Sequence, residues 1–213
     1  MKFIFIRHGE TYSNTLFGSP NQILIGALDN ELTQLNEKGI SQAENAREQL
    51  NKLGIMESID GIYSSDLTRT IQTTEIIFGD KAYIKDKRLR ERSLGILEGM
   101  KIVDVNENEM LSNTLPDSDD METFFDRKHP TGENYIDVYH RCSDFLNQFD
   151  YSSDKTIVIV SHFHTIRCFI YALLNKEFDE NFNSLLIENS TPYIFDYDVS
   201  SFKCISSSLS INY

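Results

Sequence analysis

The stretch MKFIFIRHGETYSN, residues 1–14, decides the fold that this sequence predicts. Residues 3–6 form a short run of β-branched and aromatic side chains, which at this length is typical of a buried strand. Arg7, His8 and Gly9 follow at the carboxyl end of that strand, where open α/β sheets bind their ligands. Arg7 offers a planar fork of donors for a phosphate or carboxylate, Gly9 permits a sharp turn, and His8 offers a nitrogen that can attack or carry protons. We expect His8 to be a nucleophile; a surface turn after a strand is the alternative.

A second histidine follows a second buried strand. Residues 156–161, TIVIVS, form the clearest strand of the chain, apolar and β-branched as a central parallel strand should be. His162 comes next, and a helix begins near Thr165. His162 and His164 are also spaced as two metal ligands on a strand would be, because alternate residues point the same way. No third group of ligands accompanies them, so we favour a site without a metal.

Arg69 stands where the strand, loop and helix pattern recurs. Residues 61–64 are a predicted strand, and a helix follows with Leu67, Ile71, Thr74 and Phe78 on one face. Arg69 lies in the first turn of this helix, near free backbone N–H groups that favour anions. It is a candidate phosphate clamp; an ordinary surface arginine paired with Asp66 or Glu75 is the alternative.

Glu91 is flanked by two arginines, Arg90 and Arg92. Such a carboxyl should titrate low and stay ionised, which suits a base. Beside a dianionic phosphate its pKa would rise, and the same group could then donate a proton. A charged surface loop is the alternative interpretation.

The remaining elements complete an α/β pattern. Thr33 is a plausible N-cap for a helix whose apolar residues recur at helical spacing, ending at Gly54; these residues are Ile40, Ala43, Ala46, Leu50 and Leu53. We expect a short edge strand in residues 83–89, followed by a polar, acidic loop or lid in 104–122 with a short helix near 121–127. An amphipathic helix should run from Tyr135 to Phe149. Residues 193–197 and 202–205 should form an antiparallel hairpin.

Composition restricts the partners. The chain has 213 residues and a formal net charge of −13, which argues against nucleic-acid and anionic-membrane surfaces. Its three cysteines are widely spaced and form no CxxC pair, as expected of reduced thiols in a reducing compartment. No apolar run approaches the ~20 residues that cross a bilayer. We expect a cytoplasmic protein. The oligomeric state stays open, because the sequence marks no exposed apolar seam.

Six motifs in order resemble the histidine phosphatase superfamily, the phosphoglycerate-mutase-like proteins. They are RHGET (7–11) with Asn14, DNELT and GISQA (29–43), SSDLTRTIQT (64–73), LRERSLGILEG (89–99), PTGEN (130–134) and VSHFHTIR (160–167). The resemblance implies a single domain over residues 1–213, a three-layer α/β/α sandwich around a largely parallel sheet, with a lid or insertion around 99–131.

The resemblance also implies site residues and a mechanism. His8 would carry a phosphohistidine, Glu91 would be the general acid and base, and the phosphate pocket would be formed by Arg7, Asn14, Arg69, His162 and Phe163. Thr11 and Arg92 are possible further substrate contacts. Two guanidinium groups and an imidazole can spread positive charge over a transferring phosphoryl group. No cofactor or metal is required.

Departures from the family pattern bear on the reaction. The second histidine is followed here by Phe163 and His164, bulkier than the usual glycine pair. Lys101 is one place short of the lysine that the mutases carry, and residues 104–122 contain no arginine pair. We therefore favour hydrolysis of a small phosphomonoester. The alternatives are a mutase that returns the phosphoryl group to its substrate, and a non-catalytic protein that binds phosphorylated ligands.

Overall fold

The computed structural model of the chain describes residues 1–113, 124–197, 201–204 and 210–211. Its strands are β1 (Lys2–Arg7), β2 (Gly61–Ser64), β3 (Ile84–Lys85), β4 (Thr156–Ser161), β5 (Pro192–Asp196), β6 (Ser201–Cys204) and β7 (Ser210–Ile211). Its α-helices are α1 (Glu37–Lys52), α2 (Thr68–Phe78), α3 (Ile102–Glu107), α4 (Glu109–Ser112), α6 (Tyr135–Leu146) and α7 (Phe163–Leu173). None of the helices in these residues is long and apolar enough to cross a membrane.

One sheet holds these strands in the order β3-β2-β4-β1-β5-β6-β7. The first four strands are parallel, and β5, β6 and β7 continue the sheet with antiparallel pairing. The α/β class and the antiparallel C-terminal hairpin predicted from the sequence are confirmed. β7 extends that hairpin by a further short strand.

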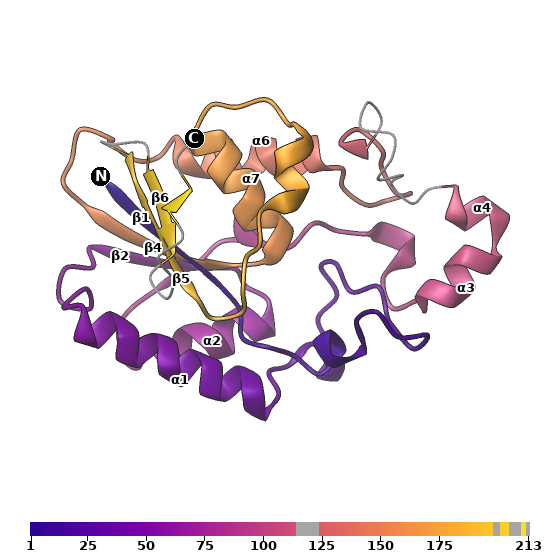
Figure 1. Cartoon of the computed structure of the whole chain (residues 1–213), viewed down its shortest axis with the longest axis horizontal. Coiled ribbons are helices and arrows are strands. Elements are labelled where there is room, and N and C mark those ends of the chain that lie inside the picture. Colours follow the sequence, from indigo (N-terminus) through magenta and orange to yellow (C-terminus); the bar gives the residue numbers. More distant parts are fainter. Residues whose placement is uncertain (114–123, 198–200, 205–209, 212–213) are drawn as a thin grey trace.

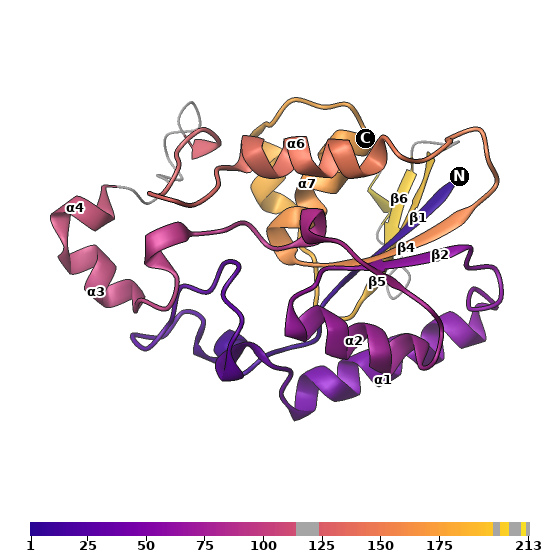
Figure 2. The same cartoon turned by 180° about the vertical axis from the view of Figure 1, so that it is seen from behind.

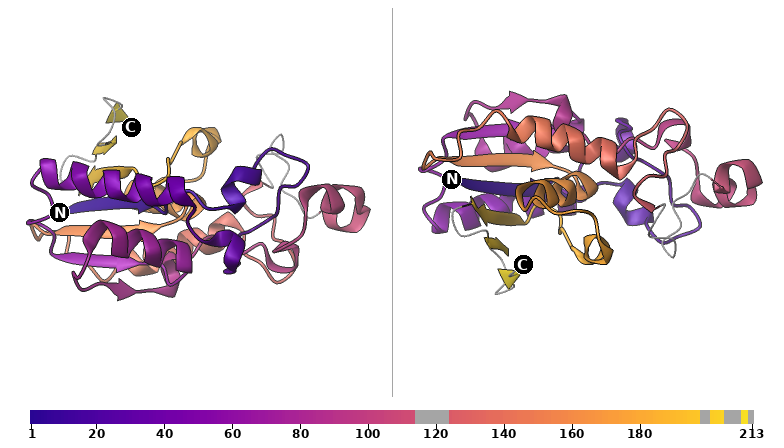
Figure 3. Two further views of the ribbon diagram at one scale, coloured as in Figure 1. Left: turned by 90° about the horizontal axis from the view of Figure 1, so that it is seen from below. Right: turned by 90° about the horizontal axis from the view of Figure 1, so that it is seen from above.

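Helices cover both faces of the sheet (Figure 1). On one face, Ile4 and Ile6 of β1 pack with the apolar side chains of α1 and α2. On the other, Phe3 and Phe5 pack with α6 and α7. The two helix pairs lie on opposite sides of the strands when the molecule is seen from below and from above (Figure 3). The alternation of β1 side chains therefore supplies two cores, as a fully buried strand requires.

Helix α1 begins later than the sequence predicts. Its N-cap is Asn36, whose Oδ1 accepts a hydrogen bond from the backbone N–H of Gly39 at 2.8 Å. Thr33 instead closes a capping box with Asn30 around a short 3-10 helix. Gly54 follows the helix with φ +67°, as predicted. Ile40 is 41% exposed, so the buried face is formed by the small residues and Leu50 rather than by Ile40.

The loop after β1 lies directly against α1. A Cβ on Gly9 would collide with the carbonyl oxygen of Gly39, and a Cβ on Gly39 would collide with the backbone of Glu10. Both positions therefore need glycine. This close contact fixes the backbone immediately after His8.

Two further predictions are corrected or partly tested. The edge strand predicted in residues 83–89 is limited to β3, because Asp86 caps a 3-10 helix, Lys87–Leu89, through the N–H of Arg88. In the predicted lid, α3 and α4 extend away from the sheet (Figure 2). Residues 104–113 of the predicted acidic loop are largely helical, in α3 and α4, whereas residues 114–122 and the start of the short helix near 121–127 lie outside the described residues.

Candidate active site

The sheet register brings the two predicted histidines together. Arg7, the last residue of β1, pairs with Ser161, the last residue of β4. His8 and His162 therefore leave neighbouring parallel strands at the same level, with their ring centroids 5.3 Å apart. The two histidines that follow separate strands in the sequence thus lie side by side at one edge of the sheet.

His8 is held as a neutral imidazole. Its Nδ1 lies 2.8 Å from the carbonyl oxygen of Gly9, which can only accept, so Nδ1 carries the proton and Nε2 keeps its lone pair. The residue is 6% exposed. Burial lowers the pKa of His8 well below its usual value, and the charges of Arg69 and Arg7 lower it further. A neutral ring with a free Nε2 is a competent nucleophile.

His162 has partners on both ring nitrogens. Arg69 Nε donates to its Nδ1 at 3.2 Å, so the proton sits on Nε2, which lies 2.9 Å from the hydroxyl of Ser65. Burial and the Arg69 charge hold the pKa of His162 well below its usual value. Ser65 follows β2, so three neighbouring strands supply this cluster.

Arg69 is buried, and each of its three guanidinium nitrogens donates one hydrogen bond, which leaves one further N–H on Nη1 and one on Nη2. Besides His162, its guanidinium donates to the carbonyl oxygens of Leu28 at 2.9 Å and Gly26 at 2.8 Å. Burial lowers the pKa of Arg69 to about 10, so the group remains charged at neutral pH. The alternative of a surface arginine paired with Asp66 or Glu75 is wrong, because Asp66 pairs with Arg90.

The N-terminus of α2 already has an anion. The carboxylate of Asp29 accepts from the backbone N–H of Thr68 at 3.1 Å and from its hydroxyl at 2.9 Å. From the sequence we expected these N–H groups to be free for a ligand. Instead, Asp29 caps the helix and ties the 26–29 loop to it, which places the two carbonyls that hold Arg69.

Arg7 is the last residue of β1, and Asn14 lies in the loop that follows the strand. Arg7 donates to the carbonyl oxygen of Ile187 at 2.9 Å, and its Nε is buried with no partner. Its guanidinium carbon lies 5.0 Å from the centroid of the Phe163 ring. The side-chain oxygen of Asn14 accepts from the N–H of Thr11 at 3.0 Å, which leaves its NH₂ group to donate elsewhere.

Glu91 is fixed by the backbone on two sides. Its Oε1 accepts from the N–H of Arg92 at 2.8 Å, and its Oε2 accepts from the N–H of His164 at 3.2 Å, in the first turn of α7. Burial alone would raise the pKa of Glu91, but His164, His162 and the Arg92 N–H together hold it well below its usual value. The resting carboxyl is therefore ionised, as predicted.

Two more arginines surround this carboxylate. Arg92 is 6% exposed, lies 4.5 Å from the Tyr135 ring centroid, and keeps a buried Nε without a partner. Arg167 lies 4.0 Å from the Phe163 ring centroid and donates to the carbonyl oxygen of Leu185 at 2.7 Å. Phe163 thus contacts both Arg7 and Arg167, and the crevice is strongly positive in an acidic protein.

Sequence reasoning missed the residues that hold the crevice loops. Glu98 Oε1 accepts from the N–H groups of Ala27 and Leu94, each at 2.9 Å, and so joins two loops that border Arg69. Asp29 and Ser65 were also not assigned a role. All three act through contacts distant in sequence, for which no local pattern exists.

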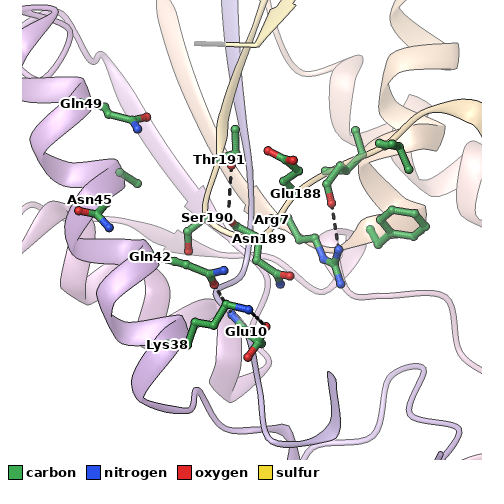
Figure 4. A pocket seen from close by; sticks show the side chains of 14 residues that line it. Arg7, Glu10, Lys38, Gln42, Asn45, Gln49, Glu188, Asn189, Ser190 and Thr191 are labelled. Atoms are coloured by element: carbon green, nitrogen blue, oxygen red, sulfur yellow. Dashed lines mark hydrogen bonds and ion pairs between the residues drawn. The ribbon is translucent and has the colours of Figure 1, made fainter. Parts of the chain in front are cut away.

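A polar hollow of about 630 Å³ has Arg7 in its lining (Figure 4). Lys38 and Gln42 of α1 face the 188–191 loop across it, and Lys38 pairs with Glu10 at 2.7 Å. Arg7 therefore borders both this hollow and the histidine cluster. In the part of the chain that the structure describes, no group of three or more His, Cys, Asp or Glu side chains could hold a metal ion.

A family model described as the histidine phosphatase superfamily (branch 1) matches residues 3–208. The chain belongs to this superfamily, and the resemblance noted from its motifs is confirmed. Among its relatives, phosphoglycerate mutase-like protein 4 of Arabidopsis thaliana is 30% identical over 175 residues, which cover 78% of this chain and 68% of the relative. The probable phosphoglycerate mutase GpmB of Proteus mirabilis is 30% identical over 178 residues, covering 82% of this chain and 75% of the relative.

Solved structures share the fold. The phosphoserine phosphatase of Entamoeba histolytica, in complex with 3-phosphoglyceric acid, superposes with a TM-score of 0.73 at 25% identity, covering 100% of this chain and 97% of that one. The alpha-ribazole phosphatase of Shigella flexneri gives a TM-score of 0.75 at 22% identity, covering 92% and 90%. Family and relatives together support an enzyme of the phosphatase or mutase kind.

Proposed function

We propose that this protein hydrolyses a small phosphomonoester through a phosphohistidine on His8. The observation that carries the proposal is the hydrogen bond from His8 Nδ1 to the Gly9 carbonyl, which leaves a neutral Nε2 in a crevice lined by Arg7, Arg69 and His162. A nucleophile beside concentrated positive charge is what attack on a phosphate ester needs.

In the first half-reaction, His8 Nε2 forms a bond to phosphorus as the bond from phosphorus to the ester oxygen breaks. Arg7, Asn14 and Arg69 would bind the non-bridging oxygens, on which charge is spread in the transition state. His162 would join them by exchanging the Ser65 hydroxyl for a phosphate oxygen as the acceptor of its Nε2 proton. Glu91 would give a proton to the departing alcohol oxygen. The products are the free alcohol and phospho-His8.

In the second half-reaction, water attacks the phosphorus of phospho-His8. Glu91, now ionised, takes a proton from that water as the phosphorus–nitrogen bond breaks. Inorganic phosphate leaves, and His8 returns to its neutral form. The scheme uses only residues of this chain and needs neither a metal nor a cofactor.

A mutase is the second candidate, because the relatives from Arabidopsis thaliana and Proteus mirabilis are named as mutase-like and as a probable mutase. A mutase must retain its intermediate and grip a second anionic group on the substrate. Arg92, with its unpartnered Nε, could supply part of that grip. Against it, residues 104–122 carry no arginine pair, so we rank hydrolysis first. A non-catalytic binding protein ranks last, because every proposed catalytic position holds a competent residue.

The substrate we propose is small, as are 3-phosphoglyceric acid and phosphoserine, which are bound in crystal structures of the Entamoeba histolytica phosphatase. We further propose that residues 99–131 are a lid or insertion segment, of which residues 99–113 and 124–131 are described. The segment is anchored at its start, where the N–H of Gly99 donates to the carbonyl oxygen of Leu24 at 2.8 Å.

The cellular location we propose for the protein is the cytoplasm. The buried free thiols of Cys142 and Cys168 and the acidic charge of the chain favour this location.

A product assay tests the proposal. The protein is incubated with 3-phosphoglycerate, with and without 2,3-bisphosphoglycerate, and beside it with phosphoserine and other small phosphomonoesters, while free phosphate and 2-phosphoglycerate are measured together. We expect phosphate release without isomerisation, and none from a His8→Ala preparation, which controls for contaminating phosphatases. Primer-dependent 2-phosphoglycerate would identify a mutase, and no turnover of any ester would favour the binding protein.

A further inference from the structure

His164 lies beside Glu91, the proposed general acid, and has no part in the two half-reactions described above. Its Nδ1 is 3.5 Å from Glu91 Oε2, the oxygen that also accepts from the His164 backbone N–H. The ring packs against Tyr135 and Phe163, with centroid distances of 5.5 Å and 5.1 Å. The imidazole is therefore held with one nitrogen toward the carboxylate.

Exposure differs between the two side chains. That of Glu91 is 12% exposed, whereas that of His164 is 32% exposed. The imidazole thus has access both to the carboxylate and to solvent. A histidine so placed can exchange protons with water on one side and with the carboxylate on the other.

The resting state of Glu91 makes such a group necessary. Glu91 is ionised before substrate binds, because two histidines and the Arg92 N–H hold its pKa low. An ionised carboxylate cannot protonate a leaving alcohol. A proton must therefore reach Glu91 before it can protonate the leaving oxygen.

We propose that His164 is the residue that passes this proton between solvent and Glu91. This inference rests on the proposed function. In the first half-reaction the His164 imidazolium gives its Nδ1 proton to Glu91 Oε2, and Glu91 gives a proton to the leaving oxygen. In the second, Glu91 takes a proton from the attacking water and returns it to Nδ1. His164 then again carries the proton with which it began, so the cycle balances.

The groups around His164 set the pH at which it can act. Glu91 faces it from the loop before η4 (Gly95–Leu97), together with Arg92; Tyr135 faces it from α6, and Arg167 from its own helix. Burial and the two arginines lower the pKa of His164, and Glu91 raises it. A bound dianionic phosphate would raise it again. Since the proton donor is the imidazolium, turnover should fall as pH rises through the pKa of His164 in the complex.

The experiment compares the wild-type protein with His164→Asn and His164→Ala on two esters. Glycerol 2-phosphate has a poor leaving group that needs protonation, and p-nitrophenyl phosphate does not. Asn can still donate to Glu91 but cannot carry a proton across. His140→Ala is the matched control, because His140 is an exposed histidine of α6.

We expect both His164 variants to lose about tenfold or more in kcat on glycerol 2-phosphate, together with the alkaline fall. Formation of the phosphoenzyme from p-nitrophenyl phosphate, followed as nitrophenolate release in the first turnover, should change by less than about twofold, because that step needs no proton on the leaving oxygen. Added imidazole should restore part of the rate of His164→Ala. A wild-type rate and pH profile for His164→Asn on glycerol 2-phosphate would overturn the relay. Failure of the proposed function is a different result, namely no phosphate release by the wild-type protein from either ester.

Discussion

Arg69 Nε donates a hydrogen bond to Nδ1 of His162 over 3.2 Å. This contact decides the tautomer of His162, because a nitrogen that accepts from a guanidinium carries no proton. The hydrogen bond also fixes the orientation of the Arg69 guanidinium relative to the His162 ring. The remaining Arg69 nitrogens are held by the carbonyls of Gly26 and Leu28, so the arginine is positioned before any ligand arrives.

Replacing Arg69 by lysine should therefore be far from conservative. An ammonium group cannot bond His162, Gly26 and Leu28 in these directions at once. We expect kcat/KM for phosphomonoesters to fall about 10²–10³-fold, as for loss of a preorganised donor. Arg47→Lys, at an exposed position on α1, is the control and should change kcat/KM little. Equal effects of the two substitutions would show that Arg69 has no special role.

Asp29→Ala should destabilise the protein by removing the cap of α2. We expect the free energy of unfolding to drop by about 0.5–2 kcal/mol, the usual cost of a lost N-cap. Urea denaturation measures this. Asp80→Ala removes the same charge just beyond the opposite end of the helix, where no cap is lost and an acidic group is unfavourable. If Asp80→Ala cost as much as Asp29→Ala, the capping explanation would be wrong.

Glu91→Gln should separate esters by their leaving groups. An alkyl phosphate needs a proton on the departing oxygen, so its turnover should drop about 10²–10⁴-fold. Formation of the phosphoenzyme from p-nitrophenyl phosphate should be affected much less, because nitrophenolate leaves unaided. Single-turnover kinetics on both esters give this comparison. Equal losses would contradict the acid role of Glu91.

The buried histidines should make the fold sensitive to mild acid. Burial depresses the pKa of His8 and His162, and partial burial that of His164, below the value of about 6.5 expected in the unfolded chain. At a pH between the pKa of a histidine in the folded protein and its pKa in the unfolded chain, the unfolded state binds more protons, so the free energy of unfolding rises with pH. Stability should therefore be constant above about pH 7 and fall as pH drops below about 6.5, in the absence of phosphate. Glu91 affects stability at lower pH. Because its pKa is depressed in the folded protein, its stabilising contribution is lost as the pH falls below about 4.5.

Urea midpoints measured from pH 8 to pH 5 test this window. The slope between pH 6.5 and pH 5 should become smaller in the variant His162→Asn, which cannot titrate there. An unchanged slope would mean that His162 is not a buried neutral group in the folded protein.

The strands that carry the histidines could be predicted from the sequence. Residues 3–6 and 156–161 are short, uncharged and β-branched, and such runs can bury both faces only in the middle of a sheet. Parallel neighbours end at the same edge, which is why His8 and His162 could be expected together. The register of β1 with β4 confirms this.

The caps and loop contacts could not be predicted in the same way. Thr33 and Asn36 are both good N-cap residues. Asn36 is selected by tertiary contact, because its amide also donates to Glu10 at 3.0 Å. Likewise, Asp29 reaches Thr68, and Glu98 reaches Ala27, across long sequence separations. A periodic pattern describes one element at a time and contains no information about such pairs.

Trapping the covalent intermediate tests the central claim most directly. The protein is mixed with excess p-nitrophenyl phosphate, quenched within the first turnover, digested and mapped by mass spectrometry under conditions that preserve phosphohistidine. The account predicts one phosphoryl group on His8, formed no slower than nitrophenol is released, and none in His8→Asn. Phosphate release by the wild-type protein with no label on His8, or with label on another residue, would contradict it.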